Sequence, residues 1–188
     1  MEKAEKIEKA EPDYKIGREL FSESEISRRV KTLAGQVVSE TKGRDLLVVG
    51  ILNGAVIFLS DLIRRMPAEL DAKIDFMSIS SYGNATQSSG AVRILKDVNS
   101  DIEGRDVLIV EDIVDTGLTL SYLLNIMYTR KPASLRTCVL LDKREKRQVE
   151  VKVEYCGFVI PDVFVVGYGL DYGGKWRHLP SICELDSI

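Results

Sequence analysis

The sequence lacks the residues and segments that define several large classes of protein. It has 188 residues but one histidine, His178, and three scattered cysteines with no CxxC pair, at 138, 156 and 183. A disulfide framework, a zinc site and a cluster of catalytic histidines are therefore excluded. No apolar run approaches the roughly 20 residues needed to span a bilayer, and the charged first twelve residues contain no apolar signal-peptide core. We therefore expect a cytoplasmic protein that does not enter membranes.

The bulk composition is that of an ordinary globular protein. Hydrophobic residues make up 45% of the chain and charged residues 29%, with a net charge of -3. The length predicts a single domain over residues 1–188, in which residues 1–12 form a frayed, charged head. Because the chain is acidic overall, its charge does not favour binding to nucleic acid.

Short apolar runs alternate with amphipathic segments along most of the chain. Ser22 and Glu25 form a capping box, which predicts a helix that ends near Lys42 and Gly43. Further helices are predicted at 55–66 and 118–130, and buried strands at 46–52, 73–80, 106–110 and 135–141. A short strand at 91–95 is expected to pair back with the strand before it, and strand-like stretches follow at 151–159, 164–168 and 183–185. This alternation predicts an α/β fold with a mostly parallel sheet flanked by helices.

The most informative segment is VLIVEDIVDTGLT, at residues 107–119. A buried strand runs into Glu111, Asp112 and Asp115, whose carboxylates repel one another unless a cation binds near them. Both Glu111 and Asp112 can face one ligand only if the strand ends there. The Asp-Thr-Gly that follows, at a helix start, offers free backbone N–H groups to a phosphate. The segment therefore suits a sugar phosphate, with an acidic helix cap at Asp115 as the plainer alternative.

Other polar residues stand at positions where a site could form. Asn53 and Gly54 follow a buried strand, although an ordinary turn is the better explanation of them when they are taken alone. Lys143 follows the strand at 135–141, within a charge run that otherwise reads as solvated. Asp171 and Arg177 lie in an irregular, glycine-rich stretch, where polar residues are more suggestive of a site. Neither a P-loop nor a GxGxxG motif is present.

These segments together resemble one enzyme family. VLIVEDIVDTGLT resembles the phosphoribosyl-diphosphate-binding fingerprint of type I phosphoribosyltransferases. ILNGA, SSYGN, LLDKR and GFVIPDVFVVGYGLDY, with Arg177, are similar to the hypoxanthine-guanine phosphoribosyltransferases, and most to the bacterial form. The resemblance covers roughly residues 14–186. It implies the type I fold with a small hood from the terminal segments, and a purine-salvage enzyme that makes IMP, and GMP, from 5-phosphoribosyl 1-diphosphate and a 6-oxopurine.

The resemblance also implies a role for each matching residue. Glu111 and Asp112 would hold the ribose hydroxyls directly or through Mg²⁺, and Asp115 would be the general base near purine N7. The remaining residues of the ribose and phosphate site would be Ile113, Val114, Thr116, Gly117, Leu118 and Thr119. The pyrophosphate would bind to Leu52, Asn53, Gly54 and Arg177, although Asn53 stands where the family often has lysine.

The purine would be recognised from the C-terminal third of the chain. Lys143 would donate to the 6-oxo group, Phe164 would stack on the ring, and Val165 would contact it through its backbone. Asp171 would complete this side of the site and bind a second Mg²⁺. Ser81 and Tyr82 would begin a loop, predicted at 81–90, that closes over the reaction.

The resemblance leaves the base, the subunit number and one functional alternative open. The family forms dimers and tetramers, so a homo-oligomer is expected. The first alternative is a transferase for xanthine or another base. The second is a nucleic-acid-binding regulator that retained the fold, which the acidic charge and the three retained carboxylates disfavour.

Overall fold

The computed structural model describes residues 14–81 and 92–187. A six-stranded sheet lies at its centre, with the strand order β4-β3-β2-β5-β6-β7. All neighbours pair in parallel except β3 and β4, which are antiparallel. Its strands are β2 (Leu46–Leu52), β3 (Ala72–Ser81), β4 (Val92–Lys96), β5 (Asp106–Val114), β6 (Ser134–Asp142) and β7 (Tyr155–Val159). The predicted α/β class with a mostly parallel sheet is confirmed.

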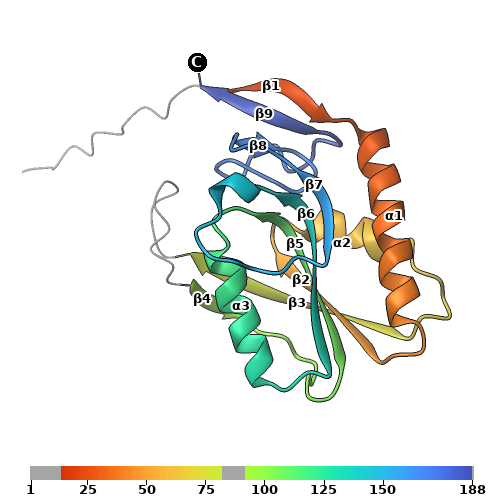
Figure 1. The fold of residues 1–188 in the computed structure, drawn as a ribbon. Helices are drawn as coiled ribbons and strands as arrows, with labels where there is room; N and C mark the ends of the chain where they lie inside the picture. Colours follow the sequence, from red (N-terminus) through yellow and green to blue (C-terminus); the bar gives the residue numbers. More distant parts are fainter. Residues whose placement is uncertain (1–13, 82–91, 188) are drawn as a thin grey trace, which may run out of the picture.

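Helices cover both faces of this sheet (Figure 1). On one face lie α1 (Glu23–Thr41) and α2 (Val56–Ile63), whose buried side chains share a core with Val48, Leu108 and Leu140. On the other face lies α3 (Leu118–Thr129), which packs in a second core with the alternate strand residues, such as Val49 and Ile109. Strands buried on both faces explain the nearly continuous apolar runs of the sequence.

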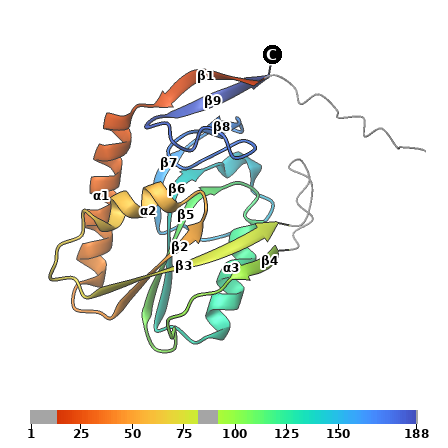
Figure 2. The same ribbon diagram turned by 180° about the vertical axis from the view of Figure 1, so that it is seen from behind.

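A second, three-stranded sheet with the order β1-β9-β8 lies above one end of the main sheet (Figures 1 and 2). It consists of β1 (Tyr14–Phe21), β9 (Ile182–Ser187) and β8 (Val165–Val166), and both pairings are antiparallel. The hood predicted from the terminal segments is this sheet. The predicted head at residues 1–12 lies outside the described residues.

Most elements agree with the sequence predictions, but the strand predicted at 164–168 is only β8 (Val165–Val166), and the helix predicted at 55–66 ends at Ile63. Helix α1 is capped by Ser22 with the predicted capping box. β1 was not predicted, and the expected strand at 151–159 begins only at Tyr155. β5 does not end at Val110 but continues to Val114, because β6 pairs with it up to Asp142. Within the described part of the chain, no helix is long and apolar enough to cross a membrane.

Candidate active site

The strand order creates a crevice at the carboxyl ends of β2 and β5. The connection from β2 leads through α2 to β3 on one side, whereas the connection from β5 leads through α3 to β6 on the other. The loops after β2 and β5 therefore diverge, and ligands of open α/β sheets bind at such a point. These two loops carry Asn53-Gly54 and the segment after Val114. A pocket of about 130 Å³ is lined there by residues 111–117, Thr119 and Leu120.

Both carboxylates of the acidic pair line this pocket, and the charge of Arg177 acts on that of Asp112. Because β5 continues through them, Glu111 and Asp112 start on opposite faces of the strand, yet both border the pocket. Glu111 Oε2 is buried and has no hydrogen-bond partner among the described residues. Burial, and to a lesser degree the Asp112 carboxylate, raises the pKa of Glu111 well above its usual range. Burial also raises the pKa of Asp112 to about 6, against a hydrogen bond from the backbone N–H of Ile113.

The C-terminal turn brings Asp171 and Arg177 into an ion pair with each other, a contact that the sequence did not predict. Arg177 Nη2 lies 2.7 Å from Asp171 Oδ1, and Arg177 Nη1 donates to the carbonyl of Gly169 at 2.7 Å. The turn packs so closely on the loop after β2 that a Cβ at Gly169 would collide with the carbonyl of Gly54. A Cβ at Gly54 would in turn collide with the carboxylate of Asp112. The loop after β2 and the 169–177 turn, which are distant in sequence, thus converge on the acidic pair of β5.

No preformed metal cage is visible in the parts of the chain that the structure describes. No group of three or more His, Cys, Asp or Glu side chains lies close enough there to hold an ion. Asp171 is engaged by Arg177, and its charge still acts on Asp112. Mg²⁺ is commonly held by one or two carboxylates together with substrate phosphates. The unpaired Glu111 oxygen and the neighbouring Asp112 fit that mode of binding.

The start of α3 is shaped for an anion. Gly117 is the N-cap residue, with a left-handed φ of 83°, and as a glycine it provides no side-chain cap. The alternative that Asp115 is the helix cap is therefore wrong. The first backbone N–H groups of the helix have no acceptor within it. The N–H of Leu118 reaches Thr116 Oγ1, at 3.4 Å. This end of α3 can therefore donate to a phosphate.

Of the residues proposed to recognise the purine, Lys143 directly follows β6, Phe164 directly precedes β8, and Val165 lies in β8. Lys143 is only 6% exposed, its backbone N–H donates to Val114, and its Nζ lies 3.2 Å from Asp162 Oδ1. Phe164 is 48% exposed, and its carbonyl accepts from the N–H of Leu185 in the hood. Val165 is buried in β8. Lys143 was thus separated correctly from the solvated residues of its charge run.

Two charged residues at the site, Lys146 and Asp162, were not identified from the sequence. Lys146 Nζ lies 3.1 Å from Asp115 Oδ2 and 3.1 Å from Asp162 Oδ1. Lys146 belongs to the short 3₁₀ helix η1 (Arg144–Lys146), directly after Lys143. The three-residue spacing of Lys143 and Lys146 just beyond a buried strand was the only sequence signal, and it was hidden in the charge run.

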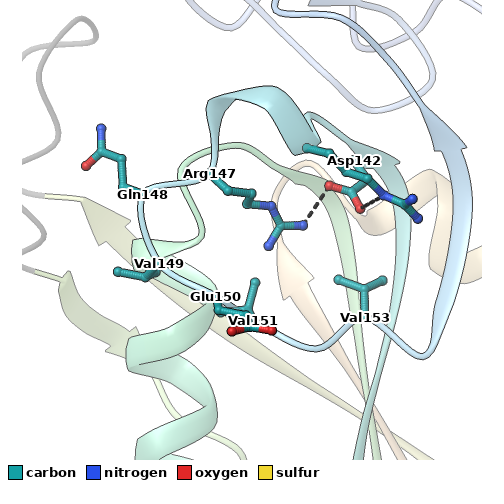
Figure 3. Close-up of a pocket in the computed structure, with 8 residues that line it drawn as sticks. Asp142, Arg147, Gln148, Val149, Glu150, Val151 and Val153 are labelled. Atoms are coloured by element: carbon teal, nitrogen blue, oxygen red, sulfur yellow. Dashed lines mark hydrogen bonds and ion pairs between the residues drawn. The ribbon is translucent and has the colours of Figure 1, made fainter.

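The chain after β6 also packs against the turn that leads from Asp115 into α3. A pocket of about 420 Å³ opens beside it, lined by Asp142, Arg144, Arg147, Gln148, Val149, Glu150, Val151 and Val153 (Figure 3). Arg147 Nη2 donates to the buried Asp142 at 2.6 Å, as Figure 3 shows. The N–H of Gln148 donates to the carbonyl of Thr116 at 2.9 Å. This second pocket thus lies beside the turn that leads from Asp115 into α3.

The structure describes only the first residue of the predicted mobile loop. Ser81 is the last residue of β3. Tyr82 and the rest of the predicted loop lie outside the described residues.

Comparison with known proteins agrees with this geometry. The family described as "Phosphoribosyl transferase domain" matches residues 18–173. The chain is 47% identical over 169 residues to the hypoxanthine-guanine phosphoribosyltransferase of Bacillus subtilis, covering 90% of this chain and 93% of that protein. It is 49% identical over 167 residues, or 89% of this chain, to the bifunctional protein TilS/HprT of Listeria monocytogenes, of whose length it spans only 26%. The crystal structure of a hypoxanthine phosphoribosyltransferase from Staphylococcus aureus superposes with a TM-score of 0.86 at 44% identity, over 91% of this chain and 92% of that one.

Proposed function

The chain belongs to the phosphoribosyl transferase family, and we propose that it transfers the phosphoribosyl group of 5-phosphoribosyl 1-diphosphate to hypoxanthine, and also to guanine. The products are IMP or GMP and pyrophosphate. The observation that carries this proposal is the convergence of the β2 loop, the acidic pair and the 169–177 turn at the sheet crevice, next to the start of α3 at Gly117.

Each part of the diphosphate substrate has a complementary group in the crevice. The 5′-phosphate binds to the backbone N–H groups of the turn from Asp115 to Thr119. The ribose hydroxyls lie against Glu111 and Asp112. Arg177, already oriented by Asp171 and Gly169, holds the leaving pyrophosphate together with the backbone of Asn53-Gly54.

The purine lies between the hood and the end of β5. Lys143 donates to the 6-oxo oxygen, which selects 6-oxopurines over adenine, because an adenine would leave this buried ammonium facing a donor. Phe164 presents its open face to the ring. Asp115 accepts the proton from N7 as N9 bonds to the anomeric carbon and pyrophosphate leaves.

Catalysis here depends on neutralising the leaving group rather than on a covalent nucleophile. The sugar passes through an oxocarbenium-like state, so charge develops on the ring and on the departing pyrophosphate. Mg²⁺, when bound, adds positive charge at the pyrophosphate oxygens. Glu111 and Asp112 would hold it, with substrate oxygens completing its coordination.

A spectrophotometric assay of the purified protein with four bases tests the function. Turnover of hypoxanthine and guanine in the presence of 5-phosphoribosyl 1-diphosphate and Mg²⁺ is expected, with adenine inactive. Preference for xanthine would redefine the base but keep the reaction. Absence of turnover with all four bases would reject the enzyme proposal and favour a regulator that retained the fold.

We further propose that the enzyme is a cytoplasmic homodimer or homotetramer. Light scattering at several protein concentrations measures the subunit number, and a monomer at all of them would overturn this part of the proposal.

A further inference from the structure

Lys146 connects the proposed general base to the proposed purine donor through one chain of charges. Its ammonium lies 3.1 Å from Asp115 Oδ2 and 3.1 Å from Asp162 Oδ1. The same Asp162 oxygen lies 3.2 Å from the ammonium of Lys143. The order Asp115–Lys146–Asp162–Lys143 therefore spans the site from the phosphate turn to the 6-oxo recognition point.

This chain of charges is better suited to fixing positions than to stabilising the fold. The side chains of Lys146, Asp115 and Asp162 are 39%, 41% and 50% exposed, and ion pairs with such exposure contribute little to stability. Burial would lower the pKa of Lys146, but hydrogen bonds to Asp115 and Asp162 outweigh it and raise that pKa. Lys146 therefore stays charged at neutral pH.

The contact makes the two oxygens of Asp115 unequal. Oδ2 is held by Lys146, whereas Oδ1 is buried and has no hydrogen-bond partner within the described residues. The terminal torsion of an aspartate is soft, so an unheld carboxylate could present either oxygen. With Oδ2 fixed, Oδ1 is the oxygen whose accepting capacity is left unused. A buried acceptor without a partner is unfavourable until a donor reaches it.

We propose that Lys146 is a positioning residue that fixes the Asp115 carboxylate, so that Oδ1 is the atom that accepts the purine N7 proton. The inference rests on the proposed transferase function. It assigns Lys146 no contact with either substrate. Its effect must therefore pass through Asp115.

The Lys146→Met variant tests this role by single-turnover kinetics with hypoxanthine. The rate is expected to fall about tenfold, within the range found for side chains that contact each other, while both KM values stay within about twofold. Lys146→Arg should retain most of the rate, because a guanidinium can also bridge two carboxylates. Lys152→Met is the matched control, since Lys152 forms a 3.1 Å pair with Glu154 but is 85% exposed and does not line the crevice pocket. It should leave the rate unchanged.

A double-mutant cycle with Asp115→Asn separates positioning from structure. In the Asp115→Asn background, Lys146→Met should change the remaining rate by less than about twofold, because no basic oxygen is left to position. A further tenfold loss in that background, or loss of rate with Lys146→Arg equal to that with Lys146→Met, would overturn the inference. The unmodified protein's turnover of hypoxanthine tests the function separately, so the two failures are distinguishable.

Discussion

At the scale of single residues, the acidic pair is kept in an environment that disfavours its charge. Both carboxyl groups have raised pKa values, and that of Asp112 is about 6. A carboxyl whose pKa is higher in the folded protein than in the unfolded chain binds protons more readily when folded. Stability contributed by Asp112 is therefore lost as pH rises from about 4 to about 6. The fold tolerates this loss at a position where a cationic ligand would reverse it.

The double variant Glu111→Gln/Asp112→Asn should therefore gain stability and lose binding. The free energy of unfolding at pH 8, measured in urea, is expected to rise or stay equal. Calorimetry with Mg²⁺ should show binding of the diphosphate substrate weakened about 10- to 100-fold, the span for disturbed metal sites. Glu103→Gln, an exposed carboxylate whose nearest ion-pair partner is 3.8 Å away, serves as the control. Unchanged affinity in the double variant would mean that the pair does not hold the substrate.

Replacing Asp115 should affect the rate far more than binding. Asp115→Asn keeps the shape of the side chain but removes its basicity, so kcat is expected to fall by about 10²–10⁴-fold. Stability should change little, because Gly117 and not Asp115 is the N-cap residue of α3. Single-turnover rates provide the measurement. A loss below about tenfold, outside the usual general-base span, would make Asp115 a positioning residue.

Residue chemistry was predictable from the sequence where one short segment contained it. Glu111, Asp112 and Asp115 lie within five residues of one another, directly after the apolar run of β5, so the sequence alone identifies them as a cluster. Lys146 does not, because its partner Asp115 lies 31 positions earlier and only the pairing of β5 with β6 brings them together. Asp162 was missed for the same reason, since it meets Lys143 and Lys146 only in the folded chain.

At the scale of elements, the turn from Asp115 to Thr119, which we propose binds the 5′-phosphate, depends on a glycine for two separate reasons. Gly117 has a φ of 83°, and a Cβ there would lie 2.8 Å from the carbonyl of Val149. Gly104 has a similar φ of 74°, but nothing lies within 4 Å of its Cβ position. The two positions thus have the same left-handed backbone, but only at Gly117 would an added Cβ collide with a neighbouring carbonyl.

Gly117→Ala should consequently be worse than Gly104→Ala. Both variants are expected to lose about 1–2 kcal/mol from the left-handed conformation. Gly117→Ala should lose more than this, and it should also weaken binding of the diphosphate substrate, because the turn must shift. Urea unfolding and calorimetry measure the two effects. Equal losses in both variants, with binding intact, would show that the Val149 contact is easily relieved.

A second feature at this scale is Asp75, whose carboxylate connects β3 to the chain after β4 through hydrogen bonds. Burial would raise the pKa of Asp75, but hydrogen bonds from the backbone N–H groups of Phe76, Ser100 and Asn99 outweigh it and hold that pKa at about 2. Because this pKa is lowered, the stabilisation is present above about pH 4 and is lost as pH falls from there towards 2.

Asp75→Asn should lower the free energy of unfolding at pH 7 by about 2 kcal/mol, the amount that corresponds to the lowered pKa. The difference between parent and variant should shrink as pH falls below 4, and thermal unfolding at several pH values measures it. A difference that is the same at pH 7 and pH 2.5 would mean that packing, and not the carboxylate charge, explains the loss.

Elements were predictable where their periodicity was local. The capping box and the apolar runs defined α1, β2 and β6 closely. Residues 151–154 look equally strand-like, but the backbone N–H of Thr137 donates to the side chain of Glu154, which replaces a ladder partner on β6. No local sequence pattern shows that a side-chain carboxylate, and not a backbone carbonyl, accepts this hydrogen bond.

At the scale of the whole molecule, the hood joins the two ends of the described chain over the crevice. Tyr14 pairs with Ser187, so β1 and β9 meet across almost the full sequence length. The family resemblance predicted a hood, but the polar pattern of β1 gave no sign of a strand, because its only partner lies so far away. Figures 1 and 2 show this small sheet beside the carboxyl ends of the main strands.

A series of aromatic contacts connects the hood to Phe164, the residue that we propose stacks on the purine. The ring of Tyr14 lies 4.4 Å from that of Tyr172, and the Tyr172 ring meets Phe164 edge to face at 5.5 Å. Such pairs contribute about 0.5–1.5 kcal/mol each beyond the area that they bury. Since Phe164 is half exposed and is proposed to stack on the purine, the orientation of its ring depends on the contacts behind it.

Tyr14→Ala should therefore weaken purine recognition from a strand that makes no contact with the reacting atoms. The KM for hypoxanthine is expected to rise about 3- to 10-fold, the equivalent of one aromatic pair, while the KM for the diphosphate stays unchanged. Tyr14→Phe keeps the ring and should behave as the parent, and Lys15→Ala, at the exposed neighbouring position, should have no effect. An equal rise of both KM values would show instead that β1 supports the crevice as a whole, because a general loosening of the hood cannot distinguish the base from the sugar.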